Sequence, residues 1–229
     1  MTYKQTSHCL FTLLVCFILV ACNTMTVRPD ARYEFDEGLS LFNKGYYKTA
    51  IPSFENAAKL DPNYAESFLY LGRSYSYLHQ WDRAIPPLRR ALGLSSEKVL
   101  DEVYDLYLTA LMEAALTESR KQNHRATINY LDEALTLKPQ SAEIQNELSR
   151  SYLAYGQYLL KKERVDEALE AFDSARKLSP ENPAIFMGLA RGFLIKGDTL
   201  QAIRAVQKTL NLDPENKGAL LLFRSMTRK

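Results

Sequence analysis

The residue in this sequence with the clearest reactive chemistry is Cys22. It directly follows the small residue Ala21 at the end of an apolar run over residues 9–21, and Lys4 precedes that run. About 13 apolar residues are too few for a helix that spans a bilayer, which needs ~20, but they suit the apolar core of a secretory signal peptide. We therefore expect residues 1–21 to be an export leader.

The phrase Leu19-Val20-Ala21-Cys22 resembles the lipobox of bacterial lipoproteins. The resemblance implies that a peptidase removes residues 1–21 and that the Cys22 thiolate is the nucleophile that takes the lipid. Cys9 and Cys16 leave with the leader, so Cys22 is then the only cysteine in the chain. Two or more acyl chains, such as palmitate, anchor a protein stably. The alternative is an uncleaved membrane anchor in which Cys22 stands by chance.

The polar residues after the lipobox predict how the folded part is attached. Residues 22–30 comprise the lipidated cysteine and a short tether that contains Pro29. By analogy with the lipoprotein family, the absence of Asp at position 23 favours the outer membrane of a diderm host, with the protein facing the periplasm. We therefore expect a membrane-anchored protein of the bacterial cell envelope.

No other residues form a catalytic or metal-binding pattern. His79 and His124 are 45 residues apart and have no cysteine partner. The sequence contains no Gly-rich phosphate loop and no Gly-x-Ser-x-Gly elbow, and carboxylates such as Asp166-Glu167 lie in charged clusters typical of solvated helix faces. The formal net charge of +2 argues against a nucleic-acid partner. We expect no enzyme activity, no metal and no cofactor.

A repeat organises the rest of the chain. Pro62, Pro139, Pro180 and Pro214 each end an apolar run in phrases such as Leu-Asp-Pro-Asn, and the last two are 34 residues apart. If each proline is the thirty-second position of a unit, four units begin at Ala31, Leu108, Ser149 and Pro183. A further unit begins at Ala65 and has Ser96 in place of the proline. A proline that ends one helix permits a turn into the next.

Three positions recur in every unit with a clear packing role. Small residues at positions 8 and 20 let two antiparallel helices approach closely, and a large residue at position 24 fills the gap between them. Position 8 holds Gly38, Gly72, Ala115, Gly156 and Ala190; position 20 holds Ala50, Ala84, Thr127, Ala168 and Ala202; position 24 holds Phe54, Leu88, Leu131, Phe172 and Val206.

This pattern closely resembles the tetratricopeptide repeat family over residues 31–216. The resemblance implies an all-α fold, a right-handed superhelical solenoid of about five helix pairs, followed by a capping helix over residues 217–229 with Leu220, Leu221 and Phe223 on the last repeat. The predicted units cover residues 31–64, 65–98, 99–141, 142–182 and 183–216.

Two units are longer than the family's period. The second and third units are separated by nine extra residues, and the third and fourth by seven. Apolar residues continue a helical stripe through both inserts, which predicts long helices over residues 97–121 and 141–163. The register of the inserts stays open, because the extra turns fit at either end of each helix. Their apolar residues, including Val103, Tyr107, Ile144 and Leu148, suggest a ridge that receives a partner or a second copy.

The resemblance also predicts a partner groove along the first helix of each unit. In this family, positions 5 and 9 of that helix tend to face the concave side. These positions hold Phe35, Leu39, Leu69, Arg73, Met112, Leu116, Leu153, Gln157, Met187 and Arg191. Such a surface fits an amphipathic helix or apolar strand with acidic neighbours. The alternative is that position-5 residues pack between adjacent repeats.

These features favour a membrane-anchored scaffold for protein–protein interactions in the bacterial envelope, with assembly of a pilus or secretion apparatus among its candidate processes. The alternative is an accessory or enzymatic subunit that acts on cell-wall material. A cytosolic cochaperone is disfavoured, because the leader directs the chain outward. In addition, Phe35 and Leu39 stand where such cochaperones carry the Lys and Asn that clamp a peptide carboxylate.

Overall fold

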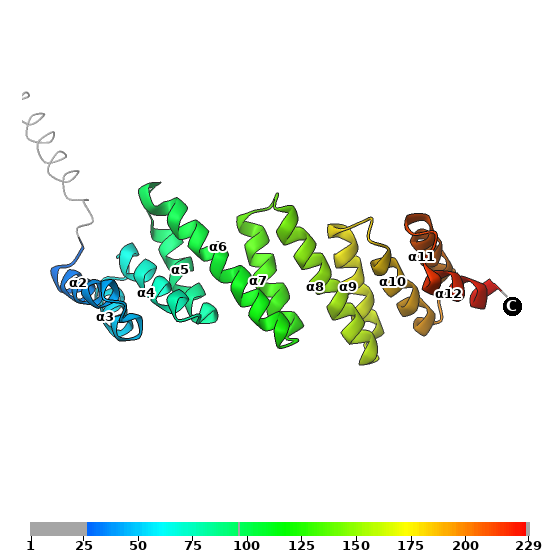
Figure 1. Ribbon diagram of the computed structural model, residues 1–229, viewed down its shortest axis with the longest axis horizontal. Helices are drawn as coiled ribbons and strands as arrows, with labels where there is room; N and C mark the ends of the chain where they lie inside the picture. The colour runs from blue at the N-terminus through cyan, green and yellow to red at the C-terminus, as the bar shows by residue number, and fades with distance from the viewer. Residues whose placement is uncertain (1–26, 96, 228–229) are drawn as a thin grey trace, which may run out of the picture.

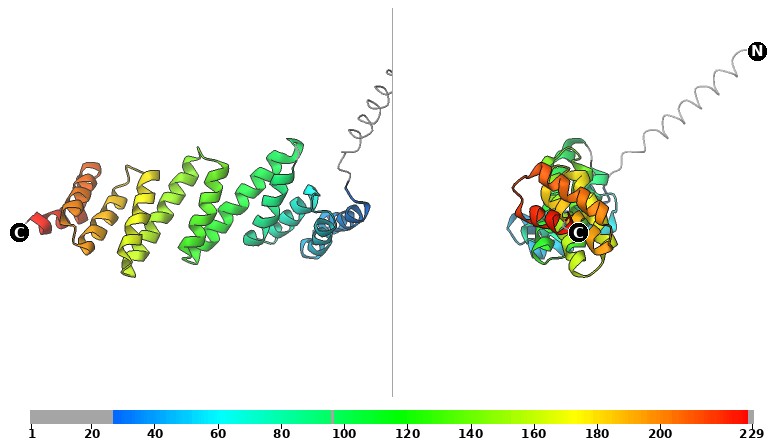
Figure 2. Two further views of the ribbon diagram at one scale, coloured as in Figure 1. Left: turned by 180° about the vertical axis from the view of Figure 1, so that it is seen from behind. Right: turned by 90° about the vertical axis from the view of Figure 1, so that its right-hand side faces the viewer.

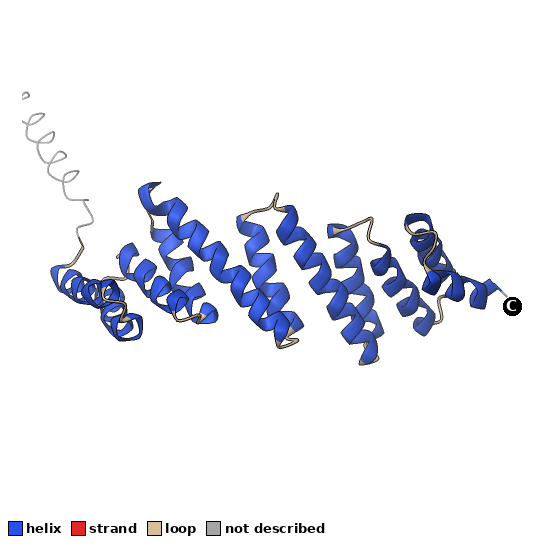
Figure 3. Ribbon diagram, viewed as in Figure 1, coloured by secondary structure: helices blue, strands red, loops and turns tan. Residues whose placement is uncertain are grey.

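The computed structural model describes residues 27–95 and 97–227, and this part of the chain is helical throughout (Figures 1 and 3). Eleven helices and no strand occur in these described residues. The predicted leader and the predicted lipidation site Cys22 lie outside them. The helices stack in sequence order along one long axis, with the first helix at one end and the last at the other (Figures 1 and 2).

Ten of the helices form five pairs, each a first helix and a second helix joined by a short turn. The pairs are α2 (Pro29–Asn43) with α3 (Tyr47–Leu60), α4 (Ala65–Tyr77) with α5 (Trp81–Leu94), α6 (Glu97–Arg120) with α7 (His124–Leu137), α8 (Ala142–Lys161) with α9 (Val165–Leu178), and α10 (Pro183–Lys196) with α11 (Thr199–Leu212). The second helices all have 14 residues, whereas α6 and α8 have 24 and 20. The two predicted long helices are therefore confirmed.

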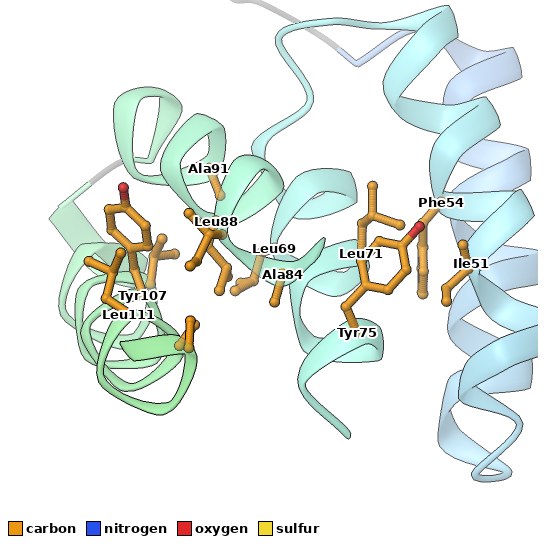
Figure 4. Packing of buried hydrophobic residues seen from close by; sticks show 14 of the residues in the cluster. Ile51, Phe54, Leu69, Leu71, Tyr75, Ala84, Leu88, Ala91, Tyr107 and Leu111 are labelled. Atoms are coloured by element: carbon orange, nitrogen blue, oxygen red, sulfur yellow. The ribbon is translucent and has the colours of Figure 1, made fainter. Parts of the chain in front are cut away.

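A small residue on the first helix faces a large one on the second helix of the same pair. A Cβ added to Gly38 would lie 2.8 Å from Phe54, and one added to Gly72 would lie 2.5 Å from Leu88. Phe54 and Leu88 are completely buried, and Figure 4 shows Leu88 between the ribbons of neighbouring helices. The packing predicted for positions 8 and 24 is confirmed in these pairs.

The same contact settles the register of the inserts. A Cβ added to Gly156 would lie 2.5 Å from Phe172, as at Gly38 and Phe54. The turn after each first helix also contains one residue with positive φ at position 15 of the unit, namely Gly45, His79, Gln122, Glu163 and Gly197. Both observations place the extra turns at the amino-terminal ends of α6 and α8.

Four apolar residues of the extra turns that were expected to form an exposed ridge do not form one. Val103, Tyr107, Ile144 and Leu148 are all buried in the core. The ridge prediction is wrong because the extra turns of each long helix also pack against adjacent helices. Their apolar side chains are buried in those contacts.

A final helix, α12 (Lys217–Thr227), covers the last pair. Its Ala219 is completely buried, and Leu222, Phe223 and Met226 pack against the core of the last two pairs. Leu221 was expected to help cover the last repeat, but it points to solvent and is 67% exposed. The fold is therefore a solenoid of five helix pairs with a capping helix, as predicted.

Candidate partner groove

Three hollows follow one another along the first helices. The N-terminal hollow, of about 630 Å³, lies between α4 and α6, and the central hollow, of about 330 Å³, lies between α6 and α8. The C-terminal hollow, of about 740 Å³, is lined by α8, α10 and the start of α12. Together they form the candidate groove.

The N-terminal hollow has a cluster of aromatic side chains in its lining. Phe42, Tyr77 and Trp81 line it, together with His79, whose ring packs edge-on against Trp81 at 5.6 Å between ring centroids. Arg73 of α4 also lines it and forms an ion pair with Glu102 of α6. The Arg73 guanidinium lies 4.8 Å from the centroid of the Tyr70 ring. The side chain of Arg73 is thus paired and only 25% exposed.

The central hollow has an apolar floor and an acidic rim. Met112, Leu116 and Leu131 line the floor. Glu113, Glu143, Glu147 and Arg150 line the rim, and Arg150 forms an ion pair of 2.8 Å with Glu147. The rim therefore carries more negative than positive charge at neutral pH.

The C-terminal hollow has an apolar floor and a basic rim. Leu160, Met187, Leu194 and Ile195 line the floor. Its charged lining residues are Lys161 of α8 and Arg191 of α10, and no acidic residue of the described chain lines it. Gln157 and Asn216 add amide groups that both donate and accept hydrogen bonds.

One face of α8 connects the central and C-terminal hollows. Glu143, Glu147 and Arg150 line the first, and Gln157 and Lys161 line the second. Residues three or four apart share a helix face, and these positions follow that spacing through the exposed Ala154. The two hollows therefore belong to one continuous surface.

Six of the ten predicted groove residues line the hollows. They are Arg73, Met112, Leu116, Gln157, Met187 and Arg191. Leu39 and Leu153 are half-buried beside the core. Whether any of these residues contacts a partner stays a prediction.

Phe35 and Leu69 depart from the predicted groove. They are only 5% and 4% exposed, so they offer no surface to a partner. The Phe35 ring packs against those of Phe54, Tyr64 and Tyr70, at 5.6, 4.9 and 5.4 Å between centroids. This is the alternative in which position-5 residues pack between adjacent repeats.

Several lining residues were not identified from the sequence. Tyr77 and Trp81 flank the turn between α4 and α5, and His79 lies within that turn. Glu143 and Glu147 lie in the extra turns of α8. The signal for the two glutamates was their spacing along α8: Glu147 is three residues from Arg150, and Glu143 is four residues from Glu147, which places all three on one helix face once the register of α8 is known.

A polar network lies outside the groove, where α5, α6 and α7 meet. Arg89 Nε and Nη2 donate to the two carboxylate oxygens of Glu133 at 2.7 and 2.8 Å, and Tyr107 also donates to Glu133. Burial alone would raise the pKa of Glu133, but the hydrogen bonds from Arg89 and Tyr107 outweigh it and hold that pKa below its usual 4.5. Burial, reinforced by Glu133, raises the pKa of Tyr107 to about 12.

The described residues show neither a metal cluster nor a membrane span. No three His, Cys, Asp or Glu side chains within them converge as a metal site would require. Within the same part of the chain, no helix combines the length and apolarity needed to cross a bilayer. The groove itself combines apolar floors with charged rims, as the hollows above show.

Comparison with known proteins agrees with this architecture. A family model described as tetratricopeptide repeat matches residues 35–99 and 153–217. The segment between the two matches contains most of α6, all of α7 and the extra turns of α8. The unmatched part is thus where the first helices are longest.

Similar proteins come from several lineages. The chain is 26% identical over 180 residues to protein O-mannosyl-transferase TMTC1 of Homo sapiens, and 27% identical over 187 residues to BBSome complex member BBS4 of Bos taurus. These alignments cover 79% and 82% of this chain but only 19% and 26% of those proteins. The crystal structure of a TPR repeats protein from Bacteroides fragilis has a TM-score of 0.55, with 15% identity, and the match covers 88% of this chain and 99% of that one.

Proposed function

The chain belongs to the tetratricopeptide repeat family, whose arrays generally act as scaffolds for protein–protein interactions, and we propose that it is a lipid-anchored scaffold that binds a protein segment in the groove. The observation that carries this proposal is the continuous face of α8, which joins two hollows with apolar floors. A buried apolar contact supplies affinity, and charged rims supply orientation and specificity.

The membrane attachment in this proposal rests on the sequence. The lipobox Leu19-Val20-Ala21-Cys22 supports lipidation of Cys22, and residues 23–30 supply the tether. We place the protein in the bacterial envelope, at the outer membrane facing the periplasm. A scaffold at that position suits the assembly of a pilus or secretion apparatus, whose subunits must be held at the membrane.

Site-specific crosslinking in the native envelope tests the groove. A photoreactive amino acid replaces Leu116 in the central hollow or Ile195 in the C-terminal hollow, which are 45% and 60% exposed. The matched control replaces Tyr33 of α2, which is 71% exposed and lines none of the three hollows. We expect one partner to crosslink from both groove positions and not from Tyr33. Capture of that partner from Tyr33 alone would contradict the proposal.

A further inference from the structure

The charge of the groove changes sign along α8. The central hollow is lined by three glutamates and one arginine, and that arginine is paired with Glu147. The C-terminal hollow is lined by Lys161 and Arg191. A segment of uniform charge would be attracted at one hollow and repelled at the other, because like charges across an interface disfavour binding.

We propose that the groove selects an amphipathic helix with a basic cluster at one end and an acidic cluster at the other. This inference rests on the proposed function, since it assumes that a protein segment occupies the groove. The basic cluster of the bound helix lies at Glu143 and Glu147, and the acidic cluster lies at Lys161 and Arg191. The apolar face of the helix covers Leu116 and Met112 in one hollow and Met187 in the other.

Helix α8 sets the distance between the two clusters. Glu147 and Lys161 are 14 residues apart on the same helix, which corresponds to about 21 Å at a rise of ~1.5 Å per residue. Fourteen residues make nearly four helical turns, so a partner helix beside α8 with the same spacing presents both clusters on one face. An extended segment would span the distance in about six residues.

The extra turns of α8 create this polarity. Glu143 and Glu147 both lie in the seven-residue excess of the fourth unit, whereas Lys161 lies in its ordinary part. Without its extra turns, α8 would retain Lys161 but would lack Glu143 and Glu147. The insertion therefore adds a second recognition element to the groove instead of an exposed ridge.

Designed peptides test the polarity and the spacing. The probe is a fluorescein-labelled amphipathic helical peptide with two Lys at one end and two Glu at the other, the two clusters being 14 residues apart. One comparator has the same composition with the clusters seven residues apart, and another has alternating charges. A third comparator is an extended peptide with the clusters six residues apart. Binding to the full chain in detergent micelles is followed by fluorescence anisotropy.

Charge-reversal variants locate the two ends of the peptide. Glu143→Lys with Glu147→Lys should weaken binding of the probe about tenfold, as should Lys161→Glu with Arg191→Glu. The variant that combines all four substitutions has a fully reversed groove, in which the probe docks in the opposite direction, and it should recover most of the affinity. The control, Glu170→Lys with Arg204→Glu, changes exposed charges on the second helices α9 and α11 and should bind like the wild type.

The outcomes separate this inference from the proposed function. Three outcomes would overturn the inference that the groove selects a helix with oppositely charged ends. They are equal binding of the four peptides, better binding of the extended peptide, and no recovery of affinity in the fourfold variant. If the native partner still crosslinks to Leu116 and Ile195 in that case, the proposed function stands without it. If neither the peptide nor a native partner reaches the groove, both proposals fail.

Discussion

Gly156 of α8 lies against the ring of Phe172 of α9, so closely that a Cβ added to Gly156 would stand 2.5 Å from Phe172 Cε1. Phe172 is completely buried, and the Cβ of a residue at Gly188 of α10 would stand 2.6 Å from the same atom. The Phe172 ring thus sets how closely α8 and α10 approach α9. Positions 156 and 188 require glycine because a larger residue would collide with this ring.

The first prediction is that Gly156→Ala destabilises the fold. The added methyl group overpacks the contact with Phe172, and we expect a loss of about 1–3 kcal/mol in the free energy of unfolding, measured by urea denaturation. The matched control is Gly93→Ala in α5, where no atom other than those of its chain neighbours and its own helix backbone lies within 4 Å of the added Cβ. Alanine there should stabilise by roughly 0.5–1 kcal/mol. Equal effects of the two substitutions would contradict this role for Gly156.

The second prediction concerns the turns within the pairs. Gln122 and Glu163 have φ of 58° and 60°, whereas Gly197 occupies the equivalent position with φ of 84°. Because a left-handed backbone costs ~1 kcal/mol or more for a residue with a Cβ, Gln122→Gly and Glu163→Gly should each raise the melting temperature. Gly197→Ala should lower it. A lower melting temperature in both glycine variants would show that their side chains contribute more than the backbone costs.

The fold could be predicted in detail from the sequence, because the positions that recur in every repeat are those that pack between the two helices of a pair. The pairs Gly38–Phe54 and Gly156–Phe172 lie at fixed positions of the 34-residue period, and apolar stripes revealed the length of α6 and α8. The groove was less predictable. Positions 5 and 9 of a first helix are four residues apart, so their side chains differ in direction by only ~40°, yet Leu69 is buried in the core while Arg73 lines a hollow. Pairing across helices, as between Arg73 and Glu102, depends on how successive units are stacked.

The third prediction is a dependence of stability on acid pH through Glu133. The folded-state pKa of Glu133 lies below its usual 4.5, so its contribution is present above that value and is lost as the pH falls through the folded-state pKa. Glu133→Gln should remove about 1 kcal/mol of stability at pH 7, because Arg89 is largely exposed and its pairing is screened by water. As the pH falls below the folded-state pKa of Glu133, the stabilities of the variant and the wild type should converge. A constant difference from pH 7 to pH 3 would exclude this linkage.

The fourth prediction is lipidation of Cys22. Replacing the nucleophilic thiol by a hydroxyl in Cys22→Ser should abolish labelling by a radioactive fatty acid and leave the chain unprocessed or soluble after fractionation. Cys16→Ser is the matched control, because Cys16 belongs to the predicted leader, and it should be labelled and fractionated like the wild type. If Cys22→Ser retains label and membrane location, the lipobox interpretation is wrong.

The fifth prediction separates the two arginines that were expected to share a role in the groove. Arg73 is 25% exposed at its side chain and pairs with Glu102, joining α4 to α6, whereas Arg191 is exposed in the C-terminal hollow. Arg73→Glu places two carboxylates together and should cost about 1 kcal/mol of stability, allowing for solvent screening. Arg191→Glu should leave the free energy of unfolding within about 0.5 kcal/mol of the wild type, as exposed substitutions usually do.

A double-mutant cycle completes that test. Arg73→Glu combined with Glu102→Arg restores opposite charges between α4 and α6. The double variant should therefore lose less free energy of unfolding than the sum of the losses in the two single variants. Additive effects would mean that the pair contributes nothing and that Arg73 is held by the Tyr70 ring alone. Because the swap keeps the fold while it inverts the charges of the N-terminal hollow, the same variant then reports on partner binding. A loss of partner capture at unchanged stability would assign the N-terminal hollow to the groove, and full capture would confine the partner to the two hollows along α8.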